Sequence, residues 1–299
     1  MTNRASRAGQ ALLDHAPPEF LFIVSAAAQY SGAVVAVGLF DRTSPLFVAW
    51  VRVLAAGLAL TVVSRRRLRS VPWTRHDLMW AGLFGTATGL MNTFFYLAIE
   101  RLPLGKGVTI EFIGPIAVAA LRTRSARNSA ALALAAAGVV VLGGVELGNE
   151  PLGLLFILLA SLAWAGYIVL GARVAMADRG VSGLGTGLLI GGVVLAPAGV
   201  AGIPGTRGLV TVAALAAVVG LLSSAIGYGI DQAVMRRIPV RRFSVMLALL
   251  PVTAAVFGFL FLGQSPTAID LLGMALVLGG VALQERDVRE RHPQEVETP

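Results

Sequence analysis

The chain has 299 residues, of which 56% are hydrophobic and only 13% are charged. This composition lies outside the range of soluble globular domains and is typical of an integral membrane protein. The absence of cysteine excludes disulfides, thiolate metal sites and cysteine nucleophiles. The net charge is +8, and the basic residues lie between apolar runs rather than on one periodic face. This distribution argues against nucleic acid as a partner.

Ten apolar runs of about 20 residues predict an all-α membrane protein with ten transmembrane helices. The runs cover residues 20–40, 45–63, 77–99, 103–121, 128–146, 152–174, 183–203, 209–235, 239–262 and 267–284. Residues 1–19 form a polar N-terminal tail without the pattern of a cleaved signal peptide, and residues 286–299 form a C-terminal tail.

The arginines and lysines between the runs predict the orientation of the chain in the membrane. With ten spans, both termini lie on the same side, and the segments on that side carry nineteen Lys/Arg residues against four on the opposite side. Because positive residues gather on the cytoplasmic side, both tails are predicted to be cytoplasmic.

The chain contains an internal repeat. An offset of 136 residues aligns Pro103 with Pro239, Pro115 with Pro251, and "VLGGV" at 141–145 with the same letters at 277–281. The two units are 20–147 and 152–285, each with five predicted helices. An odd number of spans per unit predicts an inverted-topology repeat around a central cavity, which is typical of transporters that work by alternating access.

Three ionisable residues fall inside predicted spans, namely Arg52, Glu111 and Asp231. Charged groups in the bilayer are costly and commonly functional. Arg52 and Glu111 lie at similar depths, about 10–12 Å from the outer surface, which makes an ion pair between them possible. Two interpretations stay open: the pair locks two helices together, or Glu111 faces the cavity and binds a substrate ammonium or a proton. Asp231 is also a candidate for the coupling ion.

Two prolines are predicted to kink helices at the cavity. Pro115 removes the backbone donor that would bond the Glu111 carbonyl, and Pro251 occupies the equivalent position in the second unit. The three histidines, His15, His76 and His292, lie in tails or loops. No metal site, cofactor or catalytic residue is therefore predicted, and an enzyme is disfavoured.

Three segments carry a resemblance to the drug/metabolite transporter superfamily, in its branch of threonine/homoserine and other small-amino-acid exporters. They are "GLMNTFFYLAIERLPLGKGVTIEFIGPIAVAAL" at 89–121, "AWAGYIVLGARVAMADRG" at 163–180 and "LSSAIGYGIDQAVMRRIPVRRFSVMLALLPVTAAVFGFLFLGQ" at 222–264. The resemblance implies ten helices in two inverted halves and export of amino acids or related metabolites. By motif position, it also implies that Arg52, Glu111, Asn92 and Tyr96 belong to the substrate site. Four aromatic residues within or near spans are further candidates to shape the cavity, with packing or interface anchoring as the alternative: Tyr30, Trp164, Tyr167 and Tyr228.

The chain departs from that family at two positions. Leu250 and Gln264 stand where family members commonly have glutamates. Proton coupling through Glu111 and facilitated diffusion therefore both stay open.

The resulting prediction is an inner-membrane secondary transporter that exports amino acids or related small metabolites. The alternatives are a carrier of another solute, such as an aromatic amino acid, a drug or a nucleotide sugar, or a membrane protein that does not transport. The predicted partners are a small-molecule substrate, the lipid bilayer and, if transport is coupled, protons. The oligomeric state is not predicted.

Overall fold

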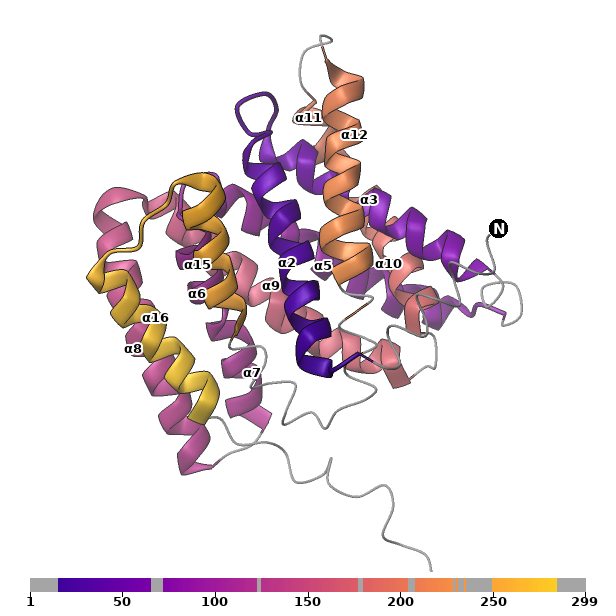
Figure 1. Cartoon of the computed structure of the whole chain (residues 1–299). Coiled ribbons are helices and arrows are strands. Elements are labelled where there is room, and N and C mark those ends of the chain that lie inside the picture. Colours follow the sequence, from indigo (N-terminus) through magenta and orange to yellow (C-terminus); the bar gives the residue numbers. More distant parts are fainter. Residues whose placement is uncertain are drawn as a thin grey trace, which may run out of the picture.

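The computed structural model describes residues 16–65, 72–122, 125–176, 180–203, 208–227, 230, 234 and 249–283. Every regular element in these ranges is a helix (Figure 1). The predicted tails lie outside the described residues, apart from residues 16–19.

In the first half of the chain, the residues that the structure describes form six helical segments. They are α2 (Pro18–Val37), α3 (Pro45–Val63), α5 (Arg75–Ile99), α6 (Leu104–Glu111), α7 (Ile113–Arg122) and α8 (Ala126–Asn149). These bounds follow the first five predicted spans, with α6 and α7 together covering the fourth.

The second half begins with α9, and a single residue, Glu150, separates α9 from α8. Its segments are α9 (Pro151–Met176), α10 (Gly180–Val194), α11 (Ala196–Ala201), α12 (Leu209–Val219), the π-helix η1 (Gly220–Gly227), α15 (Leu249–Leu262) and α16 (Ala268–Leu283). Most of the stretch from 228 to 248, which includes the end of the eighth predicted span and the start of the ninth, lies outside the described residues.

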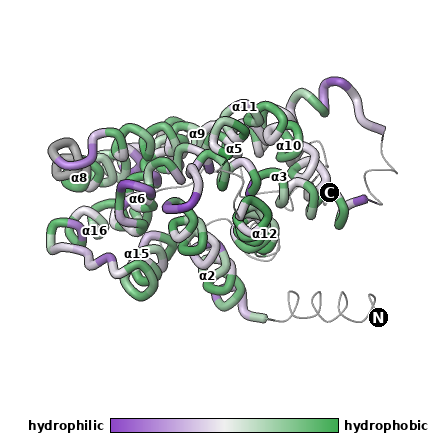
Figure 2. Tube along the Cα trace, turned by 90° about the horizontal axis from the view of Figure 1, so that it is seen from above, coloured by the Kyte–Doolittle hydropathy of each residue, from purple (hydrophilic) through white to green (hydrophobic). Residues whose placement is uncertain are grey.

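The helices have the length and composition of membrane spans. Within the described ranges, five helices are long and apolar enough to cross a bilayer, and shorter apolar helices accompany them. Many large apolar side chains lie on the outside, as at Phe259, Leu260 and Phe261, which are 56–63% exposed. The backbone trace is correspondingly hydrophobic along most of its length (Figure 2). Such a surface is stable in lipid, where exposed apolar groups cost nothing.

Short polar sequences define several helix starts. Ser44 precedes Pro45 at the start of α3, and its Oγ accepts from the Leu46 N–H over 3.2 Å. Thr74 and Asp77 form a reciprocal capping box on α5. These side chains satisfy amide groups that have no partner inside the helix.

The fourth predicted span is broken at Phe112, between α6 and α7. Pro115 has no N–H to bond the Glu111 carbonyl, and the Phe112 N–H reaches back only to Thr109, over 3.3 Å. The helix is therefore interrupted one turn before Pro115, while the place of this proline at a cavity stays a prediction. The interruption leaves Glu111 as the last residue of a short, fully buried helix.

The helices pack mainly against partners from the other half of the chain. α5 packs against α9 and α10, α3 against α10 and η1, and α2 against η1 and α15. α6 packs against α15, and α8 against α16, which lie side by side at one edge of the molecule (Figure 1). The main core cluster gathers residues from α2, α3, α5, α6, α7 and α8 in the first half and from α9, α12, α15 and α16 in the second.

Glycine permits the closest of these contacts. A Cβ on Gly85 of α5 would lie 1.8 Å from the carbonyl oxygen of Gly187 in α10, so the two backbones touch directly. Close backbone approach at small residues is a common way for helices to pack in membranes, where burial of apolar surface gives no driving force.

We expect Gly85→Ala to lower the stability of the folded protein by about 1–3 kcal/mol, because the added methyl group overlaps the α10 backbone. Thermal unfolding in detergent measures this change. Gly166→Ala is the matched control, because nothing lies within 4 Å of a Cβ on Gly166. Equal unfolding temperatures for the two variants would contradict the described α5–α10 contact.

Candidate functional site

Arg52 of α3 lies in the core and is held by two hydroxyl groups. The residue is 5% exposed, and its Nε donates to Ser224 Oγ over 3.0 Å while Nη1 donates to the Tyr96 hydroxyl over 2.7 Å. The guanidinium carbon lies 5.1 Å from the centroid of the Tyr96 ring, within the range of a cation–π interaction. Arg52 thereby joins α3 to α5 and η1.

The π-helix η1 brings Ser224 to Arg52. A Cβ on Gly220 would lie 2.4 Å from the carbonyl oxygen of Arg52, so a hydrogen atom at this position lets η1 approach α3. π-helical turns are rare, and they occur frequently at functional sites.

The same stretch of η1 extends the polar network to α2. Ser223 Oγ donates to the Gln29 carbonyl over 2.9 Å, and Ser25 Oγ donates to the Gly227 carbonyl over 3.0 Å. Gln29 Nε2 donates to Ser25 Oγ over 3.1 Å. Hydroxyl and amide groups therefore connect α2, η1, α3 and α5 inside a predominantly apolar protein.

Glu111 lies near this network without joining it. It is 7% exposed, and the charge of Arg52 acts on it electrostatically. In the described part of the chain, its carboxylate makes neither an ion pair nor a hydrogen bond. Arg52 and Glu111 lie on elements with different main neighbours, since α3 packs against α5 and η1 while α6 packs against α9 and α15. Both interpretations of the two charges drawn from the sequence remain predictions.

Three of the predicted aromatic residues each pack against a phenylalanine. The ring centroids are 6.3 Å apart for Tyr30 and Phe257, 5.1 Å for Trp164 and Phe112, and 4.9 Å for Tyr167 and Phe84. The Trp164 contact is edge-on and joins α9 to the residue that follows Glu111. It therefore supports the break between α6 and α7.

The remaining predicted residues differ in their surroundings. Asn92 is buried one turn before Tyr96, and its Nδ2 donates to the Thr88 carbonyl of its own helix over 2.8 Å. Pro115 is half-buried and Pro251 is buried in α15. Tyr228 and Asp231 lie outside the described residues.

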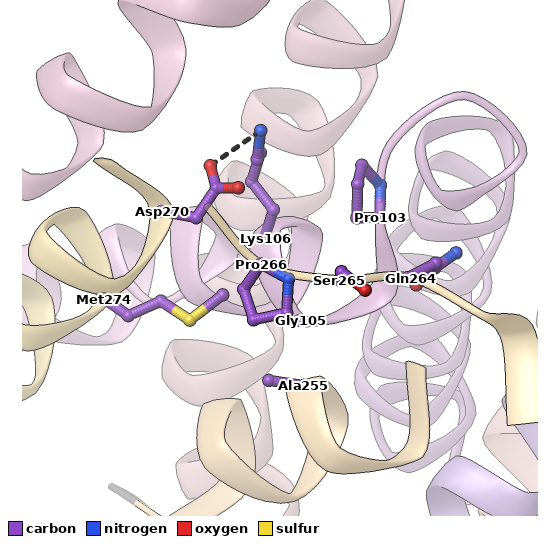
Figure 3. Close-up of a pocket in the computed structure, with 9 residues that line it drawn as sticks. All are labelled: Pro103, Gly105, Lys106, Ala255, Gln264, Ser265, Pro266, Asp270 and Met274. Carbon is purple, nitrogen blue, oxygen red and sulfur yellow. Dashed lines mark ion pairs between the residues drawn. The ribbon is translucent and has the colours of Figure 1, made fainter. Parts of the chain in front are cut away.

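A buried ion pair was not foreseen from the sequence. Lys106 of α6 and Asp270 of α16 form an ion pair of 2.8 Å, with each side chain 8% exposed (Figure 3). Asp270 also caps α16, because its Oδ2 accepts from the Thr267 N–H over 2.9 Å. The sequence carried a signal for the cap in "TAID" at 267–270, but nothing to connect it with Lys106.

Gln264, one of the two departures from the family pattern, lies beside this pair. Its Oε1 accepts from the Leu104 N–H, the first amide of α6, over 2.8 Å. The other departure, Leu250, is buried in α15 and is 8% exposed. Gln264 therefore has a structural role that a carboxylate oxygen could also fill, whereas Leu250 removes an ionisable group from the core.

The described residues include no group of three or more histidine, aspartate or glutamate side chains that could hold a metal. They do include a buried guanidinium, a buried carboxylate, amide and hydroxyl groups and several aromatic rings. These features define a helical membrane protein with charged, polar and aromatic groups in its core.

Comparison with known proteins identifies the family. The model of the EamA-like transporter family matches residues 151–284. The threonine/homoserine exporter RhtA of Salmonella typhimurium is 30% identical over 93% of this chain and 94% of its own length. The chain belongs to the EamA-like transporter family, within the drug/metabolite transporter superfamily, and is a membrane transporter.

Further relatives agree with this assignment. RhtA of Escherichia coli is 31% identical over 87% of this chain and 88% of its own length. The uncharacterized inner membrane transporter YedA of Escherichia coli is 24% identical over 84% of each chain. A crystal structure with 16% identity superimposes with a TM-score of 0.60, covering 89% of this chain and 96% of that chain, which supports the fold alone.

We expect Ser224→Ala to destabilise the protein by about 1–3 kcal/mol, because it removes a buried acceptor from Arg52 Nε. The readout is the thermal unfolding temperature in detergent. Thr253→Val is the control, since Thr253 Oγ1 is in an exposed position and bonds only to the Leu249 carbonyl of its own helix. An equal loss of stability in Thr253→Val and Ser224→Ala would contradict a stabilising role for the hydrogen bond between Ser224 and Arg52.

Proposed function

We propose that this protein is an inner-membrane exporter of amino acids or related small zwitterionic metabolites. The observation that carries the proposal is a buried guanidinium and a buried carboxylate, Arg52 and Glu111, that are electrostatically coupled without pairing directly. Two opposite charges held apart in an apolar core are suited to a solute that carries both an ammonium and a carboxylate. The names of the RhtA relatives point to the same class of solute.

Arg52 is the binding group for the substrate carboxylate in this proposal. The Tyr96 and Ser224 hydroxyls orient the guanidinium. A carboxylate makes stronger hydrogen bonds to a guanidinium than a neutral hydroxyl does, so the substrate can displace either hydroxyl as acceptor. Asn92, Tyr30, Trp164, Tyr167 and Tyr228 are the further lining residues of the proposal.

Glu111 is the binding group for the substrate ammonium, or for a proton when the site is empty. Its carboxylate has no hydrogen-bonding partner among the described residues, so a bound cation would satisfy it without breaking an existing bond. Asp231 is a second candidate for the coupling ion. The buried Leu250, in place of a family glutamate, supports facilitated diffusion as the alternative to proton coupling.

Alternating access follows from two inverted five-helix halves, 20–147 and 152–285, with both termini in the cytoplasm. The helix packing supports this part of the proposal. By their order in the two halves, α2 corresponds to α9, α3 to α10, α5 to η1, α6 and α7 to α15, and α8 to α16. Exchanging each helix for its counterpart turns the α5–α9 contact into the α2–η1 contact and the α7–α9 contact into the α2–α15 contact. The α3–α10, α6–α15 and α8–α16 contacts each map onto themselves.

We expect Glu111→Gln to reduce efflux driven by a pH gradient about tenfold or more, because the amide can neither carry a proton nor pair with an ammonium. Sealed vesicles loaded with labelled threonine provide the measurement, with and without the gradient. Glu100→Gln is the control, since Glu100 is 30% exposed and pairs with its neighbour Arg101. Wild-type efflux that ignores the gradient would identify a facilitator, and Glu111→Gln efflux equal to wild type would remove Glu111 from the site.

The cysteine-free sequence allows a direct test of orientation. We expect Thr298→Cys to react with a membrane-impermeant thiol reagent only from the cytoplasmic side. Asp41→Cys, at an exposed position between α2 and α3, is expected to react only from the outside. Labelling of both positions from the same side would contradict the predicted topology.

A further inference from the structure

The Lys106–Asp270 pair has no part in the proposed site, although it is buried to the same degree as Arg52 and Glu111. It joins α6 to the start of α16. Figure 3 shows the two side chains pointing toward each other beside the segment Gln264–Pro266, which connects α15 to α16. On the predicted topology, this is the outer end of the molecule.

The pair lies along the same short helix as Glu111. Lys106 precedes Glu111 by five residues, which corresponds to about 7.5 Å along the axis of α6. The small pocket beside the pair is lined by Gly105, Ala255, Gln264, Ser265 and Met274, among others. Lys106 and Asp270 themselves belong to the lining of this pocket, at the predicted outer end of α6.

Burial makes the pair responsive to a solute that carries both a positive and a negative charge. Removing two charges from water costs several kcal/mol each, and their mutual attraction offsets this only while both stay paired. A solute with a carboxylate and an ammonium supplies the same two charges. Lys106 can then pair with the solute carboxylate and Asp270 with the solute ammonium, so no buried charge is left without a counter-ion.

We propose that Lys106 and Asp270 form a second, outer binding site for zwitterionic solutes. The site opens when the two residues separate and each one pairs with the opposite charge of the solute. The inference rests on the proposed export function. The exchange is entirely non-covalent, and two ion pairs replace one protein pair and one pair within the solute. Solutes with a single charge leave one of the two residues unpaired and are disfavoured at this site.

Two conservative variants each remove one charge of the pair and keep a side chain of similar shape. Asp270→Asn keeps an acceptor oxygen for the Thr267 N–H that caps α16, and Lys106→Met keeps an unbranched side chain. The double variant Lys106→Met/Asp270→Asn leaves no unpaired charge. It serves as the second variant if a single one fails to fold.

The measurement is exchange of labelled threonine across right-side-out membrane vesicles, inhibited from outside by three compounds. Threonine is zwitterionic, threonine amide is a cation and N-acetylthreonine is an anion. We expect Asp270→Asn to weaken inhibition by threonine and threonine amide about tenfold, and inhibition by N-acetylthreonine much less. We expect Lys106→Met to weaken inhibition by threonine and N-acetylthreonine, and to spare threonine amide.

The outcomes distinguish this inference from the proposed function. Wild-type vesicles that exchange no threonine would overturn the export function and the outer site with it. Normal wild-type exchange, with all three compounds affected equally or not at all in the single and double variants, would overturn the outer site alone. In that case, the pair would be a structural link between α6 and α16.

Discussion

The buried guanidinium of Arg52 is the interaction on which the polar centre depends. An arginine inside the bilayer is tolerated only where other groups surround its charge. Here the hydroxyls of Tyr96 and Ser224 do so, which fixes α5 and η1 around α3. The approach of η1 further requires glycine at position 220 and a π-helical course through Ser223 and Ser224. One charge in the membrane thus determines the backbone geometry of its neighbours.

Charge separation gives this centre its capacity for binding. A guanidinium in direct contact with a carboxylate would form a closed pair that a solute could enter only by breaking it. In the proposed site, Arg52 donates to the Tyr96 and Ser224 hydroxyls, and Glu111 ends α6 directly before the break at Phe112. Both groups therefore keep the capacity to respond to an ion that arrives between them.

Hydropathy and proline chemistry were enough to predict much of this structure. The apolar runs anticipated the described helices, and Pro115 anticipated the break that isolates α6. The depths of Arg52 and Glu111 placed both in the core, which is confirmed, but depth alone could not name their partners. Ser224 becomes a partner of Arg52 through the local π-helix, and Asp270 reaches Lys106 across 164 residues of sequence. Both contacts depend on how helices rotate and approach one another, which periodicity does not specify.

The break at Phe112 also forms a point about which α6 would tilt as a rigid unit. The helix has eight residues and is about 12 Å long, with its inner end at the break. Lys106 lies far from this pivot and Glu111 directly beside it. A rigid tilt of α6 therefore sweeps Lys106 through a wide arc while Glu111 moves only slightly. Under such a tilt, the Lys106–Asp270 pair would change its geometry while the Glu111 carboxylate stayed close to its place.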